Sequence, residues 1–350
     1  VGNARSCFWF RRWYAWCVIN HVVNGKAGNL VQKEDYQEIT DSAWQDAVRD
    51  ALDGETGLYR TEQSGVAKKR KDNVNRIWDM RQWTTSVYSS AYNTAYQKFR
   101  SDVFQVEQPF RNGLMQSASA NPLFQKFMGV KYVIGRSEDG ENFTTEMQEA
   151  AAPVIYGTNQ VIAEKTYQAM KFPYNQTVLM QYAVTGNEKI VDAGVEMTKG
   201  IQETNVTFTA KQGVTKEDDS WKIKTKKEQK ATLSLDEDTS GKERILYLQF
   251  DVENGHPNRD VSIVINGIRN KLTAKNHLYY NDNTTFTYVM KLSADQEKIK
   301  VTFGAGTYRI CNLKSYVSDT TVLEDASLYG PHSHRTGTQQ RETRSVAVSR

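Results

Sequence analysis

The stretch VSIVINGIRNKLT, residues 261–273, decides the fold class of the C-terminal half of the chain. Apolar side chains recur at every second position from Val261 to Ile265, which predicts a strand with one buried face. Asn266-Gly267 is a tight hairpin signal, because the favoured two-residue turns need residues that tolerate positive φ. Arg269 to Thr273 then returns as a second strand, so this stretch predicts an antiparallel hairpin.

The same alternation continues on both sides of the hairpin. Nine short strands with almost no helix between them favour an antiparallel β-sandwich of jelly-roll type. The composition changes near Gly186, so we place the sandwich domain at residues 191–322. The nine predicted strands are Val206 to Ala210, Trp221 to Lys224, Ala231 to Leu235, Ile245 to Val252, Val261 to Ile265, Arg269 to Thr273, Phe286 to Leu292, Ile299 to Phe303 and Tyr308 to Tyr316.

The N-terminal half carries a different pattern. Asn121 is a helix cap with Pro122 at the first helical position, and Gly129 ends the short helix that follows. Val130 to Ile134 then forms an apolar run typical of a buried strand. A short helix that leads into a central strand indicates an α/β arrangement. We therefore predict an α/β or α+β module over residues 30–190.

The two ends of the chain differ in composition from both predicted domains. Residues 1–29 mix aromatic and basic side chains, which suits a membrane interface; the alternative is a poorly ordered end. Residues 323–350 form a polar tail in which Gly330 to Arg350 holds only two Val as apolar content. Such a segment cannot bury enough surface to offset its ordering entropy, so we predict disorder there.

Composition excludes several classes of protein. The chain has 350 residues, a formal net charge of +4 and well-mixed charges, so we predict no nucleic-acid partner. Its best apolar run, Trp13 to Ile19, is far shorter than the roughly 20 residues of a membrane-spanning helix, and it makes a poor signal peptide. Cys7, Cys17 and Cys311 are too few for a disulfide framework and read as unpaired thiols.

Motifs for catalysis and cofactors are missing from the sequence. It contains no GxSxG, HExxH, GxxxxGK[ST] or GxGxxG pattern, so we predict no cofactor. His332 and His334 lack a carboxylate or cysteine framework, so we predict no metal. A Ser/His/Asp triad stays open, because triads are assembled in space and not in sequence order.

Sugar binding is the better-motivated chemistry. Saccharide sites use aromatic faces together with amide or carboxylate groups, and Trp83, Tyr88, Asn93 and Trp221 offer both. Tyr88, Tyr92 and Tyr96 follow one another at helical spacing and are expected on one helix face. The alternative for all of these aromatic residues is packing in a core.

Several runs, in order, resemble the YfhO family of bacterial membrane proteins. They are Ser86 to Asn93, Asn121 to Leu123, Gly129 to Ile134, Ala152 to Thr158, Phe172 to Gln176 and Val261 to Gly267. The resemblance covers about residues 30 to 320 of this sequence. It implies the extracytoplasmic part of a polytopic GT-C-type glycosyltransferase, which transfers a sugar from a polyprenyl-phosphate carrier to a cell-wall polymer such as lipoteichoic acid.

The resemblance also implies where this chain works and with what. Its expected partners are the transmembrane portion of the same polypeptide and a cell-wall glycopolymer or polyprenyl-phosphate sugar, at the extracytoplasmic face of a bacterial plasma membrane. We transfer no catalytic residue to this chain and leave its enzymatic status open, because the membrane-embedded catalytic half is missing from it. The predicted substrate-binding residues are Trp83, Tyr88, Ser90, Asn93, Lys131, Tyr132 and Trp221.

Three functions therefore compete. The first is a non-catalytic region that helps to position the acceptor polymer. The second is a stand-alone cell-surface carbohydrate-binding module, which the isolated chain would reveal by binding glycans. The third is a soluble enzyme whose site carries no recognised motif, which would need turnover by the isolated chain.

Overall fold

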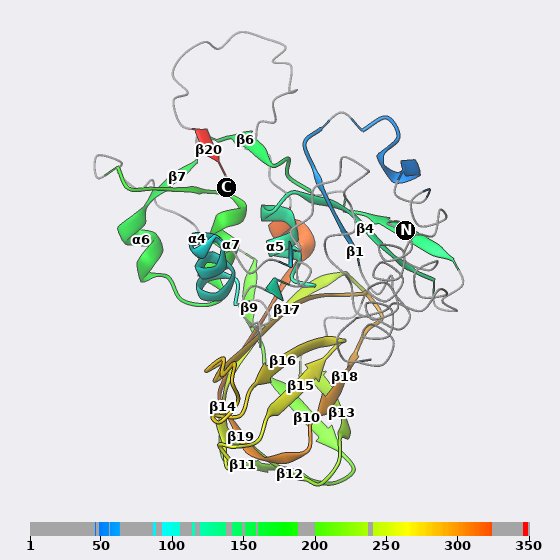
Figure 1. Cartoon of the computed structure of the whole chain (residues 1–350), viewed down its shortest axis with the longest axis vertical. Helices are drawn as coiled ribbons and strands as arrows, with labels where there is room; N and C mark the ends of the chain where they lie inside the picture. The colour runs from blue at the N-terminus through cyan, green and yellow to red at the C-terminus, as the bar shows by residue number, and fades with distance from the viewer. Residues whose placement is uncertain are drawn as a thin grey trace, which may run out of the picture.

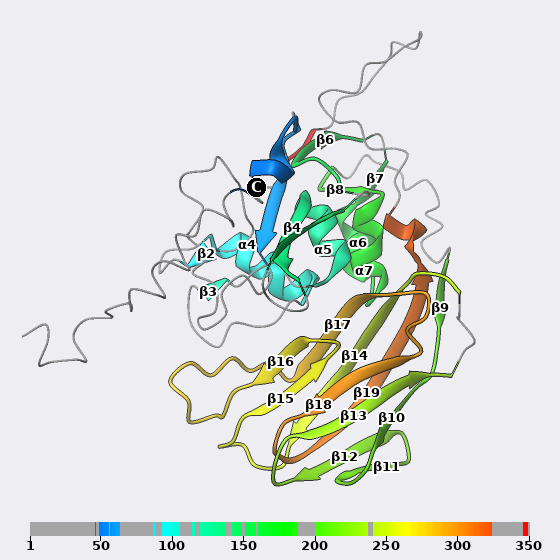
Figure 2. The same ribbon diagram turned by 90° about the vertical axis from the view of Figure 1, so that its right-hand side faces the viewer.

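The computed structural model describes residues 46, 49–55, 57–63, 87–88, 93–105, 114–115, 120–137, 142–148, 151–158, 160–187, 200–236, 241–323 and 346–348. These residues form mostly β-strands, in several sheets, with few and short helices. Figures 1 and 2 show a sandwich of strands at one end and the smaller sheets and helices at the other.

One layer of the sandwich is a five-stranded antiparallel sheet in the order β10-β13-β18-β15-β16. Its strands are β10 (Val206–Ala210), β13 (Gln229–Leu235), β18 (Lys298–Phe303), β15 (Val261–Ile265) and β16 (Ile268–Leu272). The opposite layer has the order β11-β12-β19-β14-β17, with β9 paired to β19. These strands are β11 (Val214–Glu217), β12 (Ser220–Thr225), β19 (Gly306–Asp319), β14 (Arg244–Asn254), β17 (Thr285–Leu292) and β9 (Ile201–Glu203).

The core of the sandwich lies between these two layers. Phe250, Phe286 and Tyr288 from one layer are at most 1% exposed, as are Ile263 and Phe303 from the other. All belong to one hydrophobic cluster. The antiparallel β-sandwich predicted from the sequence is therefore confirmed, and each of its nine predicted strands is present.

The predicted hairpin is present as well. Asn266 and Gly267 join β15 to β16 with φ of 50° and 82°. Positive φ at both central residues is what a type I′ hairpin turn requires, and Asn and Gly adopt it at low cost. The register pairs Ile265 with Ile268 directly across this turn.

The described N-terminal elements are short. A mixed sheet has the order β1-β4-β5, in which β4 pairs with β1 in parallel and with β5 antiparallel. Its strands are β1 (Arg60–Gln63), β4 (Val130–Arg136) and β5 (Phe143–Met147). The remaining elements are β2 (Val87–Tyr88), α4 (Thr94–Lys98), the π-helical turn η1 (Phe99–Val103), β3 (Leu114–Met115), α5 (Pro122–Phe127), β6 (Ile155–Gly157), β7 (Val161–Ala163), α6 (Glu164–Ala169), α7 (Tyr174–Thr177), the 3₁₀ turn η2 (Val178–Met180), β8 (Ala183–Thr185), the 3₁₀ turn η3 (Thr320–Leu323) and β20 (Val346–Val348).

The predicted capped helix before β4 is observed. The Asn121 side-chain oxygen accepts hydrogen bonds from the amides of Leu123 at 3.0 Å and Phe124 at 3.2 Å. Gly129 follows the helix with φ of 67°, where a β-carbon would lie 3.0 Å from the carbonyl oxygen of Ala152. The helix and strand are thus as expected, while the α/β module over residues 30–190 stays a prediction.

A second hydrophobic cluster joins the N-terminal region to the sandwich. Phe104 and Phe124, with ring centroids 5.2 Å apart, belong to it. So do Ile245 and Tyr247 of β14 and Val289 of β17, which face away from the sandwich core. The N-terminal helices therefore cover the outer face of the six-stranded sheet at the end shown uppermost in Figures 1 and 2.

The predicted divisions at residues 29 and 190 fall outside the described residues, and the one at 322 falls within η3. Residues 1–29 lie wholly outside them, as does most of the predicted polar tail. Within that tail, β20 pairs antiparallel with β6. The division into domains therefore stays a prediction.

Candidate functional site

Two predicted site residues, Lys131 and Tyr132, meet at one carboxylate. The Lys131 Nζ lies 2.5 Å from Glu55 Oε2. The Tyr132 hydroxyl donates a hydrogen bond of 2.7 Å to the same oxygen. Gly57 adds its backbone amide, 2.7 Å from Glu55 Oε1. Both predicted residues stand on β4, and the segment just before β1 brings Glu55 to them.

Aromatic rings complete the surroundings of the Lys131 ammonium group. Its Nζ lies 4.4 Å from the ring centroid of Tyr59 and 5.4 Å from that of Tyr132. Both distances are within the range at which a cation is attracted to an aromatic face. The lysine charge is therefore compensated by one carboxylate and two rings.

The hydrogen bonds at Glu55 set its protonation state. Burial by itself raises the pKa of the Glu55 carboxyl, but the hydrogen bonds from Lys131, Tyr132 and the Gly57 amide outweigh burial and lower it. Burial likewise opposes the charge of Lys131, but the hydrogen bond to Glu55 raises its pKa overall. The pair is therefore fully ionised at neutral pH. An ionised carboxylate with its donors already in place suits a structural or orienting role better than proton transfer.

The other N-terminal predictions have mixed outcomes. Asn93 precedes α4 and its side-chain oxygen accepts from the Tyr96 amide at 3.0 Å, so it caps a helix. The expected helix that carries both Tyr88 and Tyr96 is wrong, because Tyr88 lies in β2, which pairs with β3. The helix can begin only after its Asn cap, which places Tyr88 outside it. Trp83 and Ser90 lie outside the described residues.

Trp221 occupies the sandwich core and not a ligand surface. It is 7% exposed, and its ring centroid lies 5.4 Å from that of Phe208 in an edge-to-face arrangement. The Lys216 Nζ lies 5.8 Å from the indole ring centroid. Core packing, the alternative considered for this residue, is what the structure shows.

A second candidate site, which the sequence interpretation missed, is the loop of residues 273–284 between β16 and β17. We call it the tyrosine loop. Leu278 is 85% exposed, the highest value among the exposed large hydrophobic residues described, and Tyr279 and Tyr280 are 39% and 37% exposed. Exposed neighbouring aromatic residues offer flat apolar faces with a polar hydroxyl at the edge.

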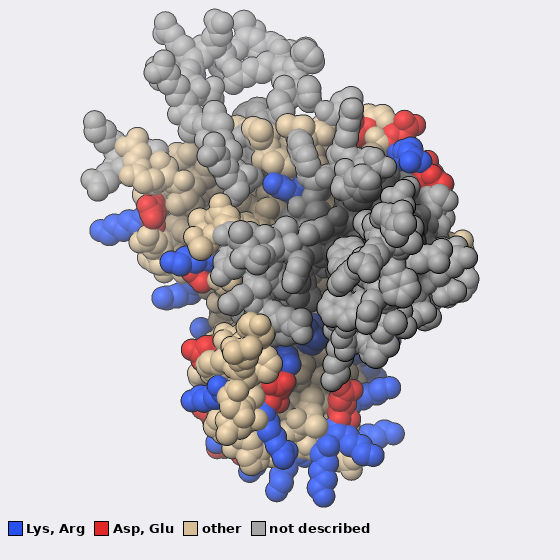
Figure 3. All heavy atoms as spheres, viewed as in Figure 1, with Lys and Arg blue, Asp and Glu red and all other residues tan. Residues whose placement is uncertain are grey.

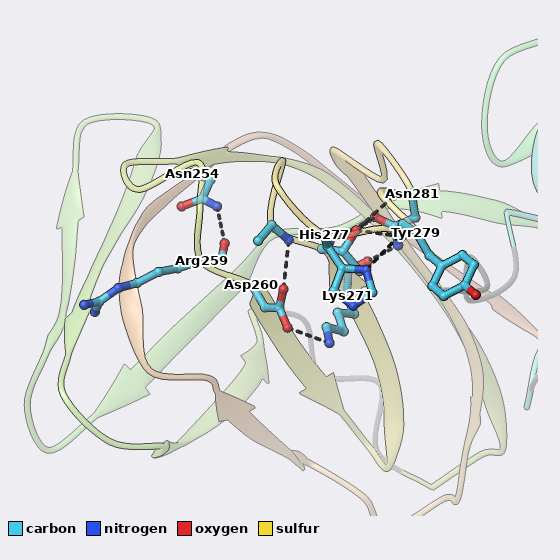
Figure 4. Close-up of polar contacts among 9 residues, drawn as sticks. Asn254, Arg259, Asp260, Lys271, His277, Tyr279 and Asn281 are labelled. Atoms are coloured by element: carbon cyan, nitrogen blue, oxygen red, sulfur yellow. Dashed lines mark hydrogen bonds and ion pairs between the residues drawn. The ribbon is translucent and has the colours of Figure 1, made fainter. Parts of the chain in front are cut away.

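Polar contacts hold the base of the tyrosine loop (Figure 4). Asn281 Oδ1 accepts from the Thr273 amide at 3.0 Å, and Asn281 Nδ2 donates to the Lys271 carbonyl at 2.8 Å. Asp260 accepts from the Ala274 amide at 2.8 Å and lies 2.7 Å from the Lys271 Nζ. The base of the loop is therefore fixed to β16 and to the residue before β15.

The exposed tip is held from within the loop. His277 Nδ1 accepts a 3.0 Å hydrogen bond from the Tyr279 amide, and the Tyr280 hydroxyl donates to Asp282 Oδ1 at 2.8 Å. In Figure 4 the ring of Tyr279 points away from the polar contacts. The tip therefore presents aromatic side chains to solvent while its backbone stays anchored.

The sequence did hold a signal for this loop. Leu278, Tyr279 and Tyr280 form an apolar run between two predicted strands, where turn residues are the rule. Within the run, apolar and polar residues do not alternate as they do in a strand with one buried face. Polar residues, His277, Asn281 and Asp282, flank it. An apolar run of this kind at a loop position is a better pointer to a binding surface than an aromatic residue within a strand.

Within the described residues, three or more His, Cys, Asp or Glu side chains nowhere gather closely enough to hold a metal ion. Nor does any helix of that part of the chain have the length and hydropathy to span a membrane.

The described chain is thus a β-sandwich with a smaller set of sheets and helices packed on one face. A family model described as bacterial membrane protein YfhO matches residues 15–346. The chain belongs to this family, as the resemblance predicted. Comparison with curated proteins found no match.

Among solved structures, the chain is similar to the C-terminal CBM6 of LamC, a laminarinase from the marine Zobellia galactanivorans, at 12% identity over 33% of this chain and 100% of that one, with a TM-score of 0.21. A variant of the carbohydrate-binding module CBM29-2 complexed with mannohexaose shares 14% identity over 35% of this chain and 82% of that one, with a TM-score of 0.19. An uncharacterized protein from Listeria monocytogenes EGD-e shares 13% identity over 34% of this chain and 11% of its own, with a TM-score of 0.18.

Proposed function

We propose that this chain is the extracytoplasmic, non-catalytic region of a membrane glycosyltransferase of GT-C type. In this proposal the enzyme transfers a sugar from a polyprenyl-phosphate carrier to a cell-wall polymer such as lipoteichoic acid. The chain helps to position the acceptor polymer for the membrane-embedded half. Membership of the YfhO family supports the link to a bacterial membrane protein.

The observation that carries the binding role is the tyrosine loop. Tyr279 and Tyr280 are more than a third exposed and follow Leu278, which is 85% exposed, and contiguous exposed apolar groups mark interaction surfaces. Asn281 and Asp260 anchor the loop, so little conformational freedom is lost when a ligand binds. An aromatic face beside amide and carboxylate groups is the chemistry expected of a saccharide site, and the tyrosine loop supplies it.

Titration of the chain with neutral oligosaccharides tests this role. Hexamers of glucose, mannose and N-acetylglucosamine serve as probes, and changes in tyrosine fluorescence or amide chemical shifts report binding. The double variant Tyr279→Ala/Tyr280→Ala should lose about tenfold or more in affinity, because each aromatic contact contributes about 0.5–1.5 kcal/mol.

The matched control is Tyr279→Phe/Tyr280→Phe, which keeps both aromatic faces and should retain most of the affinity. Equal loss in both double variants would assign binding to the hydroxyl groups instead of the rings. If none of the three hexamers binds at millimolar concentration, the saccharide role of the tyrosine loop is wrong.

Strong binding by the chain alone would favour the second candidate function, a stand-alone carbohydrate-binding module. Acceptor positioning needs only weak binding, because attachment to the membrane-embedded half supplies a high effective concentration. The affinity of the wild-type chain therefore separates the two functions.

A further inference from the structure

The outer face of the five-stranded sheet has an unusual composition. Residues that pair across the sheet share a face, and core residues such as Phe208 and Leu233 fix which face is inward. The outward-facing positions are Thr207 and Thr209 on β10, Lys230, Thr232 and Ser234 on β13, Lys298, Lys300 and Thr302 on β18, Ser262 and Val264 on β15, and Arg269 and Lys271 on β16. We call these twelve positions the basic sheet face.

The basic sheet face carries Lys or Arg at five positions, Ser or Thr at six, and no Asp or Glu. The whole chain has a formal net charge of only +4, so this excess of one sign is local. Asp260, which precedes β15, pairs with Lys271 at one edge. Lys230, Lys298 and Lys300 are exposed and form no ion pair with any described residue. Figure 3 shows Lys and Arg side chains projecting from the sandwich end of the molecule.

The positive charges follow the regular spacing of the sheet. Lys298 and Lys300 are two residues apart on β18, so their side chains leave the sheet about 6.6 Å apart. Lys230 lies on the neighbouring strand β13, paired with Thr302. Hydroxyl groups of Thr232 and Thr302 lie between the cations, where they can donate to anionic oxygens. The result is an array of donors with an anion preference.

We infer that the basic sheet face binds the phosphate groups of a linear phosphodiester polymer. A polyanion with one charge in each repeat matches an array of cations at regular intervals. Val264 is the sole apolar side chain on this face, so the face lacks the apolar residues with which proteins enter a bilayer. A polymer that lies along the sheet therefore fits better than a lipid surface.

The position of the tyrosine loop supports the same occupant. The loop follows β16 directly, and Lys271 of the basic sheet face takes part in its base through Asp260 and Asn281. Phosphates on the sheet and sugars on the loop would belong to one glycosylated polymer. This inference deepens the proposed function and rests on it for the identity of the polymer.

The test uses the full chain and a fluorescent oligomer of glycerol phosphate without sugar substituents. The triple variant Lys230→Gln/Lys298→Gln/Lys300→Gln should bind it about tenfold or more weakly than the wild-type chain. The slope of log affinity against log salt should fall by about 2, since each phosphate contact contributes about 0.7 for a single-stranded polyanion. Both effects come from exposed side chains, and an unchanged circular dichroism spectrum checks the fold.

The matched control changes the same net charge on the opposite layer. Lys222, Lys224 and Lys314 are exposed on the outer face of the six-stranded sheet, and their triple Gln variant should keep wild-type affinity. Equal losses in the two triple variants would overturn the inference, because net charge alone would then explain binding. Failure of the wild-type chain to bind the oligomer would also overturn it.

Two further outcomes separate this inference from others. Binding to phosphatidylglycerol vesicles without binding to the oligomer would assign the face to a membrane and contradict the polymer. The neutral hexamers report the tyrosine loop alone. If they bind and the oligomer does not, the basic sheet face is wrong while the proposed saccharide role stands. The reverse result would overturn the role of the loop and leave the phosphate site.

Discussion

The sandwich and the N-terminal region differ in where they keep their hydrophobic cores. The sandwich buries residues of its own two layers against each other, such as Phe250 of β14 against Phe208 of β10. The described core of the N-terminal region includes Tyr247 and Val289, which belong to the sandwich. The sandwich is therefore complete without its neighbour, whereas the N-terminal helices depend on the surface of β14 and β17.

The two outer faces of the sandwich also differ from each other. One end of the six-stranded sheet is covered by N-terminal helices, and Lys126 of α5 donates a hydrogen bond to the carbonyl of Leu323 just after β19. On the outer face of the five-stranded sheet, Lys298 and Lys300 are exposed. Among the described residues, one layer thus holds the N-terminal helices, and the proposed phosphate site lies on the other.

The largest effect should follow a cavity in the sandwich core. Phe250 is fully buried, with Phe286 and Tyr288 ring centroids at 6.0 and 5.8 Å. Phe250→Ala should lower the free energy of unfolding by about 3–5 kcal/mol. Because the N-terminal helices rest on β14, hydrogen exchange should speed up in both regions. Faster exchange in the sandwich alone would show that the N-terminal region folds independently.

A cavity on the N-terminal side should act more locally. Phe124 is also fully buried, but it lies among N-terminal side chains and the outer face of the sandwich. We expect Phe124→Ala to lower the free energy of local opening in α5 and β4 by about 3 kcal/mol. Faster hydrogen exchange in these two elements measures this loss. Amides of β13 and β18 should keep their protection. Their exposure in this variant would contradict the independence of the sandwich.

The fold of the sandwich follows from the sequence because local signals and long-range packing agree there. In β15 the alternation of Val261, Ile263 and Ile265 matches the buried face, and Asn266-Gly267 forces the turn that sets the register. Each strand pairs with partners that bury the same alternating face. Pattern and tertiary structure therefore give one answer.

The strands of the N-terminal region were harder to predict, because the buried positions there are not the apolar positions of the sequence. In β1, Thr61 and Glu62 are only 2% exposed although both are polar. These two residues lie in the middle of the strand, Arg60–Gln63. Parallel pairing with β4, far along the chain, fixes it, and no local pattern encodes such a partner.

The candidate sites also differ in how much of each could be predicted from the sequence. The sequence pointed to Lys131 and Tyr132 but gave no hint of Glu55, which pairs with both across a long stretch of chain. The sequence placed Trp221 among the predicted ligand contacts, because the pattern of a strand does not show whether its aromatic residue lies in a core or at a surface. The basic sheet face emerges only once the register shows which lysines share a side.

The smallest effect should come from the ion pair of Glu55 and Lys131. Hydrogen bonds from Lys131 and Tyr132 outweigh burial and lower the pKa of Glu55, so its contribution to stability is present above the pKa of an unfolded Glu and is lost as pH falls through the folded value. Lys131→Met should destabilise the chain by up to about 1 kcal/mol at neutral pH and by less in strong acid. Thermal unfolding of both proteins across this range measures the difference. A gap that does not shrink in acid would contradict the role given to Glu55.

Hydrogen exchange of the wild-type chain with and without the glycerol phosphate oligomer tests the central claim, that attachment and binding use opposite layers of the sandwich. The account predicts slower exchange in β13, β18 and β16 when the oligomer is present, with no change in β4 or α5. Protection that appears in β4 or α5, with none in the five-stranded sheet, would contradict it.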